Sequence, residues 1–310
     1  MGTTTRDQRT GEHTRGRSEP SNPGKELFGA GGVTKGELAE HYQRVAPAIL
    51  PHIRQRPLAL HRFPDGIDPE SGTEGFFQKQ RPDHAPDWVR GVRVERRQGG
   101  AITMVRCDDA STLGWLADQA VITLHPWPSR AADLDRPDRV IFDLDPPDDN
   151  FAEVRWAALA VREVLDEIRL ASYVMTTGSR GLHVVVPIRV ELDFDGVREL
   201  ARNVADRTAE RYPERLTTEV RKEKRGGRLF VDILRNAYGQ HAVAPFAVRP
   251  LPGAPVAMPV RWEELERIRS AQAWSVRDLG GRPDDDPWRG MARHARSPGK
   301  AARRLERVTR

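Results

Sequence analysis

The chain has 310 residues, of which 38% are hydrophobic and 31% charged, and its 50 Lys and Arg against 45 Asp and Glu give a net charge of +5. This length suffices for one large domain or two modest ones with a buried core. No apolar run approaches the ~20 residues that cross a bilayer, and residues 1–18 are polar, so we expect a cytoplasmic protein without a membrane partner. The single cysteine, Cys107, excludes an internal disulfide and a cysteine-cluster zinc site.

The N-terminal region contains a predicted tail and then a capped helix. Residues 1–22 are rich in Gly, Thr, Arg and Glu without periodicity, which predicts disorder. Thr34 and Glu37 form a capping-box pattern before apolar residues at helical spacing. Lys35 falls in the first turn of this helix, and Lys25 precedes it by ten residues. A helix N-terminus with two cations could hold a phosphate, but spacing alone equally fits two surface lysines.

Short strands are predicted next, at residues 58–63, 92–95 and 102–105. Between the first two lie Phe76 and Phe77, followed by Lys79, in a polar, loop-like segment. Adjacent aromatic side chains beside a lysine can stack on a base and hold its phosphate, although one phenylalanine could instead belong to the core. A helix over 111–120 and a strand over 121–127 follow, and the strand ends close to His125.

A short apolar strand over 140–145 ends in Asp143 and Asp145 and is stopped by two prolines. Side chains alternate along a strand, so both carboxylates point the same way, roughly 6–7 Å apart. Like charges at that distance disfavour joint ionisation, and a hard cation such as Mg²⁺ or Mn²⁺ would relieve this. Two solvated acids on a loop are the alternative. The apolar approach and the prolines favour a metal site.

The second half of the chain alternates helices at 151–169 and 194–211 with strands at 173–176 and 183–187. The glycine-rich turn between those strands carries Thr177, Ser179 and Arg180, which suits a phosphate cradle, although no Walker lysine is present.

Asp232 lies in an apolar strand predicted over 228–234. A buried aspartate is costly unless it is paired or metal-bound, so it is the natural third ligand. The sequence further predicts a strand over 243–249 with Arg249 at its end, a short helix near 262–267 and a basic tail at 291–310.

Four motifs in this order resemble the polymerase domain of bacterial ligase D, a member of the archaeo-eukaryotic primase superfamily that serves in non-homologous end joining. They are FDLDP at 142–146, TGSRGLH at 177–183, VDILRN at 231–236 and APFAVR at 244–249. The resemblance implies an α/β (α+β) fold in which a mainly antiparallel, RRM-like catalytic sheet is joined to a smaller N-terminal α/β module. We expect the module at about 23–110 and the catalytic core at about 111–290.

The resemblance also implies an activity, namely template-directed addition of NTPs or dNTPs to a primer 3′-hydroxyl at DNA gaps or broken ends. It assigns the metal ligands as Asp143, Asp145 and Asp232, holding two Mn²⁺ or Mg²⁺ ions. It assigns the nucleotide site as His125, Thr177, Ser179, Arg180, His183 and Arg249. It assigns the DNA contacts as Asn22, Lys25 and Lys35 for a 5′-phosphate and Phe76, Phe77 and Lys79 for the template, with Arg225 on a basic loop near the metals.

Two residues depart from the family pattern. Thr177 stands where serine is usual and Arg180 where lysine is commoner, and neither change removes a catalytic group. The length leaves no room for ligase and nuclease domains, and no K-x-D-G motif is present. We therefore expect a stand-alone polymerase or an excised domain, associated with the bacterial nucleoid, with Ku and a DNA ligase as partners in trans.

Two other functions fit parts of the sequence. A phosphatase of the haloacid dehalogenase type would use Asp143 as nucleophile and Asp145 as general acid, but Pro146 and Pro147 stand where that motif continues into a Gly or Thr loop. A non-catalytic DNA-end-binding adaptor would use the phosphate pocket and the basic clusters. The acidic cluster argues against it, because a pure binder gains nothing from carboxylates facing phosphates.

Overall fold

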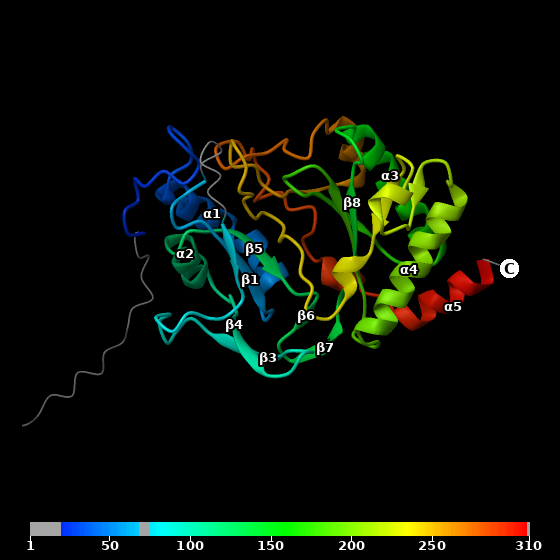
Figure 1. The fold of residues 1–310 in the computed structure, drawn as a ribbon, viewed down its shortest axis with the longest axis horizontal. Coiled ribbons are helices and arrows are strands. Elements are labelled where there is room, and N and C mark those ends of the chain that lie inside the picture. The colour runs from blue at the N-terminus through cyan, green and yellow to red at the C-terminus, as the bar shows by residue number, and fades with distance from the viewer. Residues whose placement is uncertain (1–19, 68–74, 309–310) are drawn as a thin grey trace, which may run out of the picture.

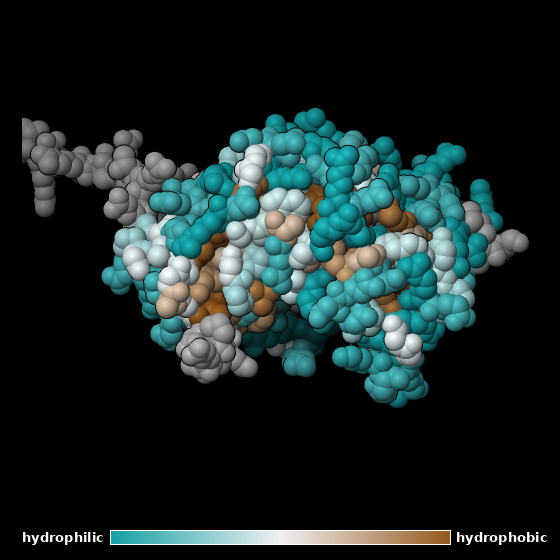
Figure 2. Space-filling view, turned by 90° about the horizontal axis from the view of Figure 1, so that it is seen from above, coloured by the Kyte–Doolittle hydropathy of each residue, from teal (hydrophilic) through white to brown (hydrophobic). Residues whose placement is uncertain are grey.

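The computed structural model describes residues 20–67 and 75–308 (Figure 1). Of the tail predicted at residues 1–22, residues 1–19 lie outside the described residues. Within the described ranges, no helix is both long and apolar enough to cross a membrane. Figure 2 shows a face that is mainly hydrophilic, with apolar residues confined to recesses between polar side chains.

The N-terminal part is an antiparallel sheet with two helices. Its strands are β1 (Leu58–Arg62), β2 (Phe76–Gln78), β3 (Gly91–Glu95), β4 (Ala101–Val105) and β5 (Val121–Pro126). β1 is central, because it pairs with β2, β4 and β5. The helices are α1 (Lys35–Ile53) and α2 (Ala110–Asp118), which pack on each other.

The capping box predicted for α1 is confirmed. Thr34 Oγ1 accepts a hydrogen bond from Glu37 N at 3.2 Å, and Glu37 Oε2 accepts one from Thr34 N at 2.8 Å. These two bonds satisfy N–H groups that the helix itself cannot, so α1 begins where the sequence predicts. The segment around Phe76, expected to be a loop, instead forms β2 on the edge of β1.

The second sheet carries the central acidic strand. Its order is β11 (Leu216–Thr217), β12 (Leu229–Asp232), β8 (Arg139–Asp145), β10 (Leu182–Pro187), β9 (Tyr173–Thr176) and β13 (Pro259–Val260). All neighbours are antiparallel except β11 and β12. Helices α3 (Phe151–Glu167) and α4 (Phe194–Arg211) lie on the side of β8 that faces away from β1 and β5 (Figure 1). The antiparallel, helix-covered sheet agrees with the predicted fold class.

One continuous apolar core joins the two sheets. It includes Leu38 of α1, Phe142 of β8 and Val184 of β10, all fully buried. A small hairpin, β6 (Ser129–Arg130) and β7 (Asp133–Pro137), connects β5 to β8. Short 3₁₀ turns follow at η1 (Lys222–Lys224), η2 (Leu234–Asn236) and η3 (Trp262–Arg267).

The strand predicted over 243–249 is not formed. Pro245 has no N–H to donate, and Phe246 adopts a left-handed conformation with φ +63°. The backbone groups of this segment are satisfied irregularly, since Phe246 N donates to Ala257 O at 2.6 Å and Thr123 Oγ1 donates to Val248 O at 2.6 Å. The segment is thereby held across the junction between the two sheets.

The basic segment at 291–310 differs from the predicted tail. It forms η4 (Met291–His294) and then α5 (Pro298–Val308), which packs against α4. Ala301 and Leu305 of α5, which lie one helical turn apart, are buried. Two small apolar positions among many arginines are a weak sequence signal, but they suffice to dock a short helix on an existing surface.

Candidate active site

Asp143 occupies the centre of the candidate site because both neighbouring strands present a polar residue to it. It is in register with Asp232 of β12 on one side and with His183 of β10 on the other. Asp145, two residues further along β8, is opposite Phe230. Asp232 is the last residue of β12 and not an interior one, and its Oδ1 accepts a hydrogen bond from Leu234 N at 2.6 Å.

Two basic side chains contact the carboxylate of Asp143. His183 Nε2 lies 3.3 Å from Asp143 Oδ1, and Arg235 Nε donates to Asp143 Oδ2 at 3.1 Å. Burial acts to raise the pKa of Asp143, but His183 and then Arg235 outweigh it and hold that pKa at about 2. Asp143 is therefore ionised at neutral pH, with its orientation set by residues on β10 and η2.

The other two carboxylates have the opposite tendency. Burial, and then the charge of Asp143, raise the pKa of Asp145. Burial also raises the pKa of Asp232, again with a contribution from Asp143. The ionised forms of both acids are thus destabilised by their surroundings, which is the condition that a bound cation would relieve.

The donor set of this site suits a hard divalent cation, since carboxylate oxygens are the ligands that Mg²⁺ and Mn²⁺ prefer. Among the described residues, however, no three His, Cys, Asp or Glu side chains converge closely enough to share one ion. Asp143 turns its carboxylate toward His183 and Arg235 instead. The residues fit a metal, but their side chains are not gathered around one position.

The glycine-rich turn packs directly against the acidic strand end. A Cβ atom on Gly181 would lie 2.1 Å from Leu144 O and 2.5 Å from Asp145 Oδ1, so only glycine allows this approach. Thr177 Oγ1 accepts hydrogen bonds from Ser179 N at 3.3 Å and Gly181 N at 3.2 Å. The Thr177 hydroxyl thus shapes the turn.

Two predicted nucleotide contacts flank this turn. Arg249 Nη1 donates to Thr177 O at 2.8 Å, which places the guanidinium beside the turn. Arg180 is exposed, and its positive charge acts to lower the pKa of Asp145. The turn therefore brings two arginines to the same end of the sheet as the three acids.

A group of aromatic rings joins the first sheet to the second. His61 stacks on Phe77 with ring centroids 4.3 Å apart and planes at 10°, and His125 and His241 have their ring centroids 5.3 and 5.6 Å from that of Phe77. His125 Nε2 and His241 Nδ1 are buried without a hydrogen-bond partner among the described residues. Burial lowers the pKa of His61 and His241 to about 4 and that of His125 well below its usual value, so all three rings are neutral at pH 7.

The phenylalanines of β2 are unusually exposed for their type. Phe76 is 49% and Phe77 48% exposed, and Arg62 lies over the Phe76 ring at 5.6 Å. The exposed Lys79 acts to lower the pKa of His241 through its charge. The predicted template residues, Phe76, Phe77 and Lys79, thus form an exposed aromatic surface with a cation nearby.

The three predicted 5′-phosphate residues come together at the start of α1. Lys25 N donates to Asn22 O at 3.0 Å, and Lys35 N donates to Lys25 O at 2.8 Å. Lys35 is only 7% exposed, and its Nζ lies 2.8 Å from both Ser21 Oγ and Asp118 Oδ1. Lys25 is exposed and donates to Pro64 O. Asp118 was not predicted, and it partly neutralises this cluster.

Comparison with known proteins agrees with this geometry. Residues 34–288 match the family model described as the LigD primase-polymerase domain. The chain belongs to this family. It is 34% identical over 262 residues to the multifunctional non-homologous end joining protein LigD of Pseudomonas aeruginosa, covering 83% of this chain and 30% of that protein. It is 32% identical over 248 residues to its Mycolicibacterium smegmatis counterpart, covering 79% and 32% respectively.

A solved structure extends the likeness to three dimensions. The polymerase domain from Mycobacterium tuberculosis ligase D in complex with DNA aligns with a TM-score of 0.77 at 31% identity, covering 87% of this chain and 99% of that one. The chain spans about a third of the length of the curated LigD relatives named above. The predicted family and fold class are thus confirmed.

In this LigD primase-polymerase domain, the sequence motifs missed several residues of the site. Arg235 contacts Asp143 directly, yet no role was predicted for it beyond its place in the motif at 231–236. His61 and His241 join the aromatic group from separate segments, where each is an isolated histidine without a spacing signal. The predicted basic-loop residue, Arg225, lies over the Phe230 ring at 4.2 Å, and its charge opposes the rise in the pKa of Asp232.

Proposed function

We propose that this chain is a template-directed nucleotidyltransferase that adds NTPs or dNTPs to a primer 3′-hydroxyl at gaps or broken ends of DNA, in repair by non-homologous end joining. Its membership of the LigD primase-polymerase family supports this role. The observation that carries the proposal is that Asp143, Asp145 and Asp232 lie on neighbouring strands at one end of the sheet, beside a glycine-rich turn and Arg249. Acids for cations and arginines for a triphosphate are what phosphoryl transfer requires.

The three aspartates would hold two Mg²⁺ or Mn²⁺ ions. When bound, such ions supply positive charge that stabilises the attacking and leaving oxygens of an in-line displacement. His183 and Arg235 keep Asp143 ionised and oriented before any ion arrives. Arg180 and Arg249 would bind the triphosphate at the turn, with charge-assisted hydrogen bonds. Ser179 lies between them on the turn, and the neutral His125 would contact the sugar of the incoming nucleotide.

The contacts to DNA would come from two surfaces on the N-terminal part. Asn22, Lys25 and Lys35 would hold the 5′-phosphate of a gap, where the N–H groups of the first turn of α1 also favour an anion. Phe76 and Phe77 would stack on template bases, with Lys79 on the backbone. The M. tuberculosis ligase D structure contains DNA, which supports a DNA substrate here. Ku and a DNA ligase would act as partners.

Primer extension on a gapped duplex tests the proposal. The assay compares substrates with and without the 5′-phosphate, Mn²⁺ with Mg²⁺, and NTPs with dNTPs. We expect extension that depends on the divalent ion and is stimulated by the 5′-phosphate. DNA-end binding without extension in any combination would favour the non-catalytic adaptor, and phosphate release from a simple monoester without nucleic acid would favour the phosphatase.

A further inference from the structure

A cavity lies at the far end of β8 from the aspartates. It has a volume of about 370 Å³ and is lined by the end of α1, the β6–β7 hairpin, the end of β10 and η4. Arg139, the first residue of β8, lines it, and Asp143 is four residues further along the strand, or ~13 Å at 3.3 Å per residue. The cavity is therefore separate from the candidate active site.

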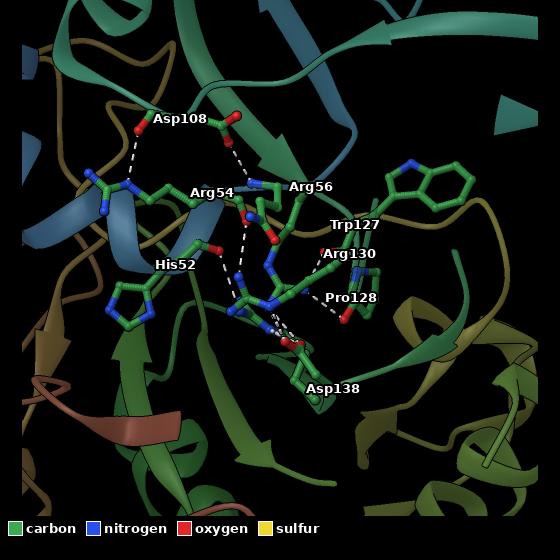
Figure 3. Close-up of polar contacts among 10 residues, drawn as sticks. His52, Arg54, Arg56, Asp108, Trp127, Pro128, Arg130 and Asp138 are labelled. Atoms are coloured by element: carbon green, nitrogen blue, oxygen red, sulfur yellow. Dashed lines mark hydrogen bonds and ion pairs between the residues drawn. The ribbon is translucent and has the colours of Figure 1, made fainter. Parts of the chain in front are cut away.

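The wall of this cavity carries more positive than negative charge. The carboxylate of Asp138 is paired with three arginines, Arg56, Arg130 and Arg139. Figure 3 shows Arg56 and Arg130 beside Asp138. Arg56 Nη2 donates to its two oxygens at 2.7 and 2.5 Å, Arg130 Nε donates to Oδ2 at 2.8 Å, and Arg139 Nε donates to Oδ1 at 3.3 Å. Three guanidinium charges against one carboxylate leave a net charge of +2 in a largely buried setting. A buried excess of charge is unfavourable until a counter-charge arrives.

Arg56 has a structural role, because its hydrogen bonds are used within the protein. It is fully buried, and its Nη1 donates to Trp127 O at 3.2 Å and Pro128 O at 2.8 Å (Figure 3). Burial, together with the charge of Arg139, lowers the pKa of Arg56 to about 9. Arg56 therefore contributes positive potential to the cavity, but its Nη groups are not available to a ligand.

Three other arginines do keep donors for a ligand. Arg130 Nη1 donates to Arg54 O at 3.1 Å and Arg139 Nη2 to His52 O at 3.3 Å. Arg130 Nη2, Arg139 Nη1 and the whole guanidinium of Arg189 have no partner in the part of the chain that the structure describes. All three side chains line the cavity. They reach it from β6, from β8 and from the residues after β10.

The remaining polar lining does not cancel this charge. Burial, then the nearby arginines, lower the pKa of His52 to about 3, so its ring is neutral at pH 7. Asp138 is the only acid among the described lining residues. The apolar lining includes Trp288, whose ring packs edge-on against His52 with centroids 5.5 Å apart, and Met291. One side of the cavity is thus cationic and the other apolar.

We propose that this cavity binds the phosphate group of a small molecule, held by Arg130, Arg139 and Arg189. A phosphate monoester carries close to two negative charges at pH 7 and offers three strong acceptor oxygens. These features match the lining residues, in which Arg130, Arg139 and Arg189 against Asp138 give a net charge of +2. A single carboxylate matches one guanidinium fork and would leave the others unused. The apolar side gives room for the organic part of the ligand. The binding is independent of the proposed polymerase activity.

Calorimetric titration of the full chain with inorganic phosphate at constant ionic strength tests the proposal. Arg130→Gln and Arg189→Gln are the test variants, since both side chains are at least partly exposed and folding does not depend on them as it does on Arg56. We expect each to weaken phosphate binding at least about tenfold, the effect of losing one charge-assisted hydrogen bond. Arg202→Gln, an exposed arginine on α4, is the matched control and should bind as wild type does.

Arg180→Gln shows where the phosphate binds, because it removes a cation from the candidate active site and leaves the cavity intact. Loss of binding in Arg180→Gln, with wild-type binding in Arg130→Gln and Arg189→Gln, would overturn the proposal, as would no phosphate binding at all. Adenosine 5′-monophosphate and a duplex oligonucleotide, each in competition with phosphate, distinguish the source. Displacement by the monophosphate supports a small molecule, whereas displacement by duplex alone contradicts it.

Discussion

Asp143 and Asp232 lie directly opposite each other on neighbouring antiparallel strands, with His183 in register with Asp143 on its other side. Two carboxylates in a cross-strand pair repel each other, and such pairs destabilise a sheet. Here His183 and Arg235 offset the charge of Asp143, whereas Asp232 is left with a raised pKa. The site therefore holds one firmly ionised acid and two acids that would gain from a cation.

Replacing Asp143 should abolish synthesis but not DNA binding. We expect Asp143→Ala to lower the rate of primer extension by more than ~100-fold, because changes that only touch the surroundings of a metal ligand already cost ~10–100-fold. Binding to a gapped duplex, measured by fluorescence anisotropy, should stay close to wild type. Asp149→Ala, on the exposed loop after β8, is the control. Extension retained in Asp143→Ala would refute the metal assignment.

Because the pKa of Asp145 is raised, replacing its carboxyl group with a neutral amide should stabilise the folded chain in a pH-dependent way. The pKa of Asp145 in the folded chain lies above its usual value of 3.8. Ionisation of Asp145 therefore lowers the stability of the folded chain as the pH rises from 3.8 to the folded pKa, and the loss is complete above the folded pKa. Asp145→Asn should therefore raise the metal-free melting temperature at pH 7, and the gain should vanish below about pH 3.8. Mn²⁺ should stabilise wild type more than the variant. A variant less stable than wild type at pH 7 would contradict this account.

Lys25 should matter for the 5′-phosphate and little else. Lys25→Ala removes an exposed cation beside the N-terminus of α1, and we expect its preference for 5′-phosphorylated gaps to fall about tenfold, since one charge-assisted contact is lost. Binding to phosphorylated and unphosphorylated gaps provides the measurement. Lys300→Ala, on α5, should keep the preference. No preference in wild type would remove the basis for the pocket.

Phe77 should contribute stacking energy to template binding. Base stacking on an aromatic side chain is worth ~1–3 kcal/mol, so Phe77→Ala should weaken binding to a template overhang roughly 5–150-fold. His61→Ala should have a smaller effect, because His61 supports Phe77 from behind by stacking on it. Trp88→Ala removes another exposed aromatic residue and should bind normally. Equal affinities of wild type and Phe77→Ala for the overhang would exclude this role.

Asp138 should be required for stability, whatever the cavity beside it binds. Asp138→Ala leaves Arg56, fully buried, without its carboxylate, and breaking such a pair costs about 3–5 kcal/mol. Urea unfolding measures this as a lower midpoint with an unchanged slope. Asp133→Ala breaks a surface pair with Arg136 and should cost at most about 1 kcal/mol. Similar losses in the two variants would show that burial does not set the energy of the Arg56 pair.

Features of the fold that depend on nearby residues were predictable. The capping box of Thr34 and Glu37 involves residues three apart, and the alternation that presents Asp143 on the face away from Phe142 is a property of any strand. The secondary-structure predictions that were wrong concern segments whose conformation depends on contacts with distant parts of the chain. Phe76 lies in a strand because β1 offers it an edge, and residues 243–249 do not form one because their hydrogen bonds go to separate parts of the chain.

The functional groups of the site were predictable from local motifs, because the acids, the glycine-rich turn and the basic residues occur in an order that identifies the family. Which charged groups contact each other depends on the folded chain. Arg235 and His183 reach Asp143 across strands, His61 and His241 meet at Phe77, and Arg56 finds Asp138 82 residues away. The cause is physical: such pairings depend on sheet order and register, which no local spacing specifies.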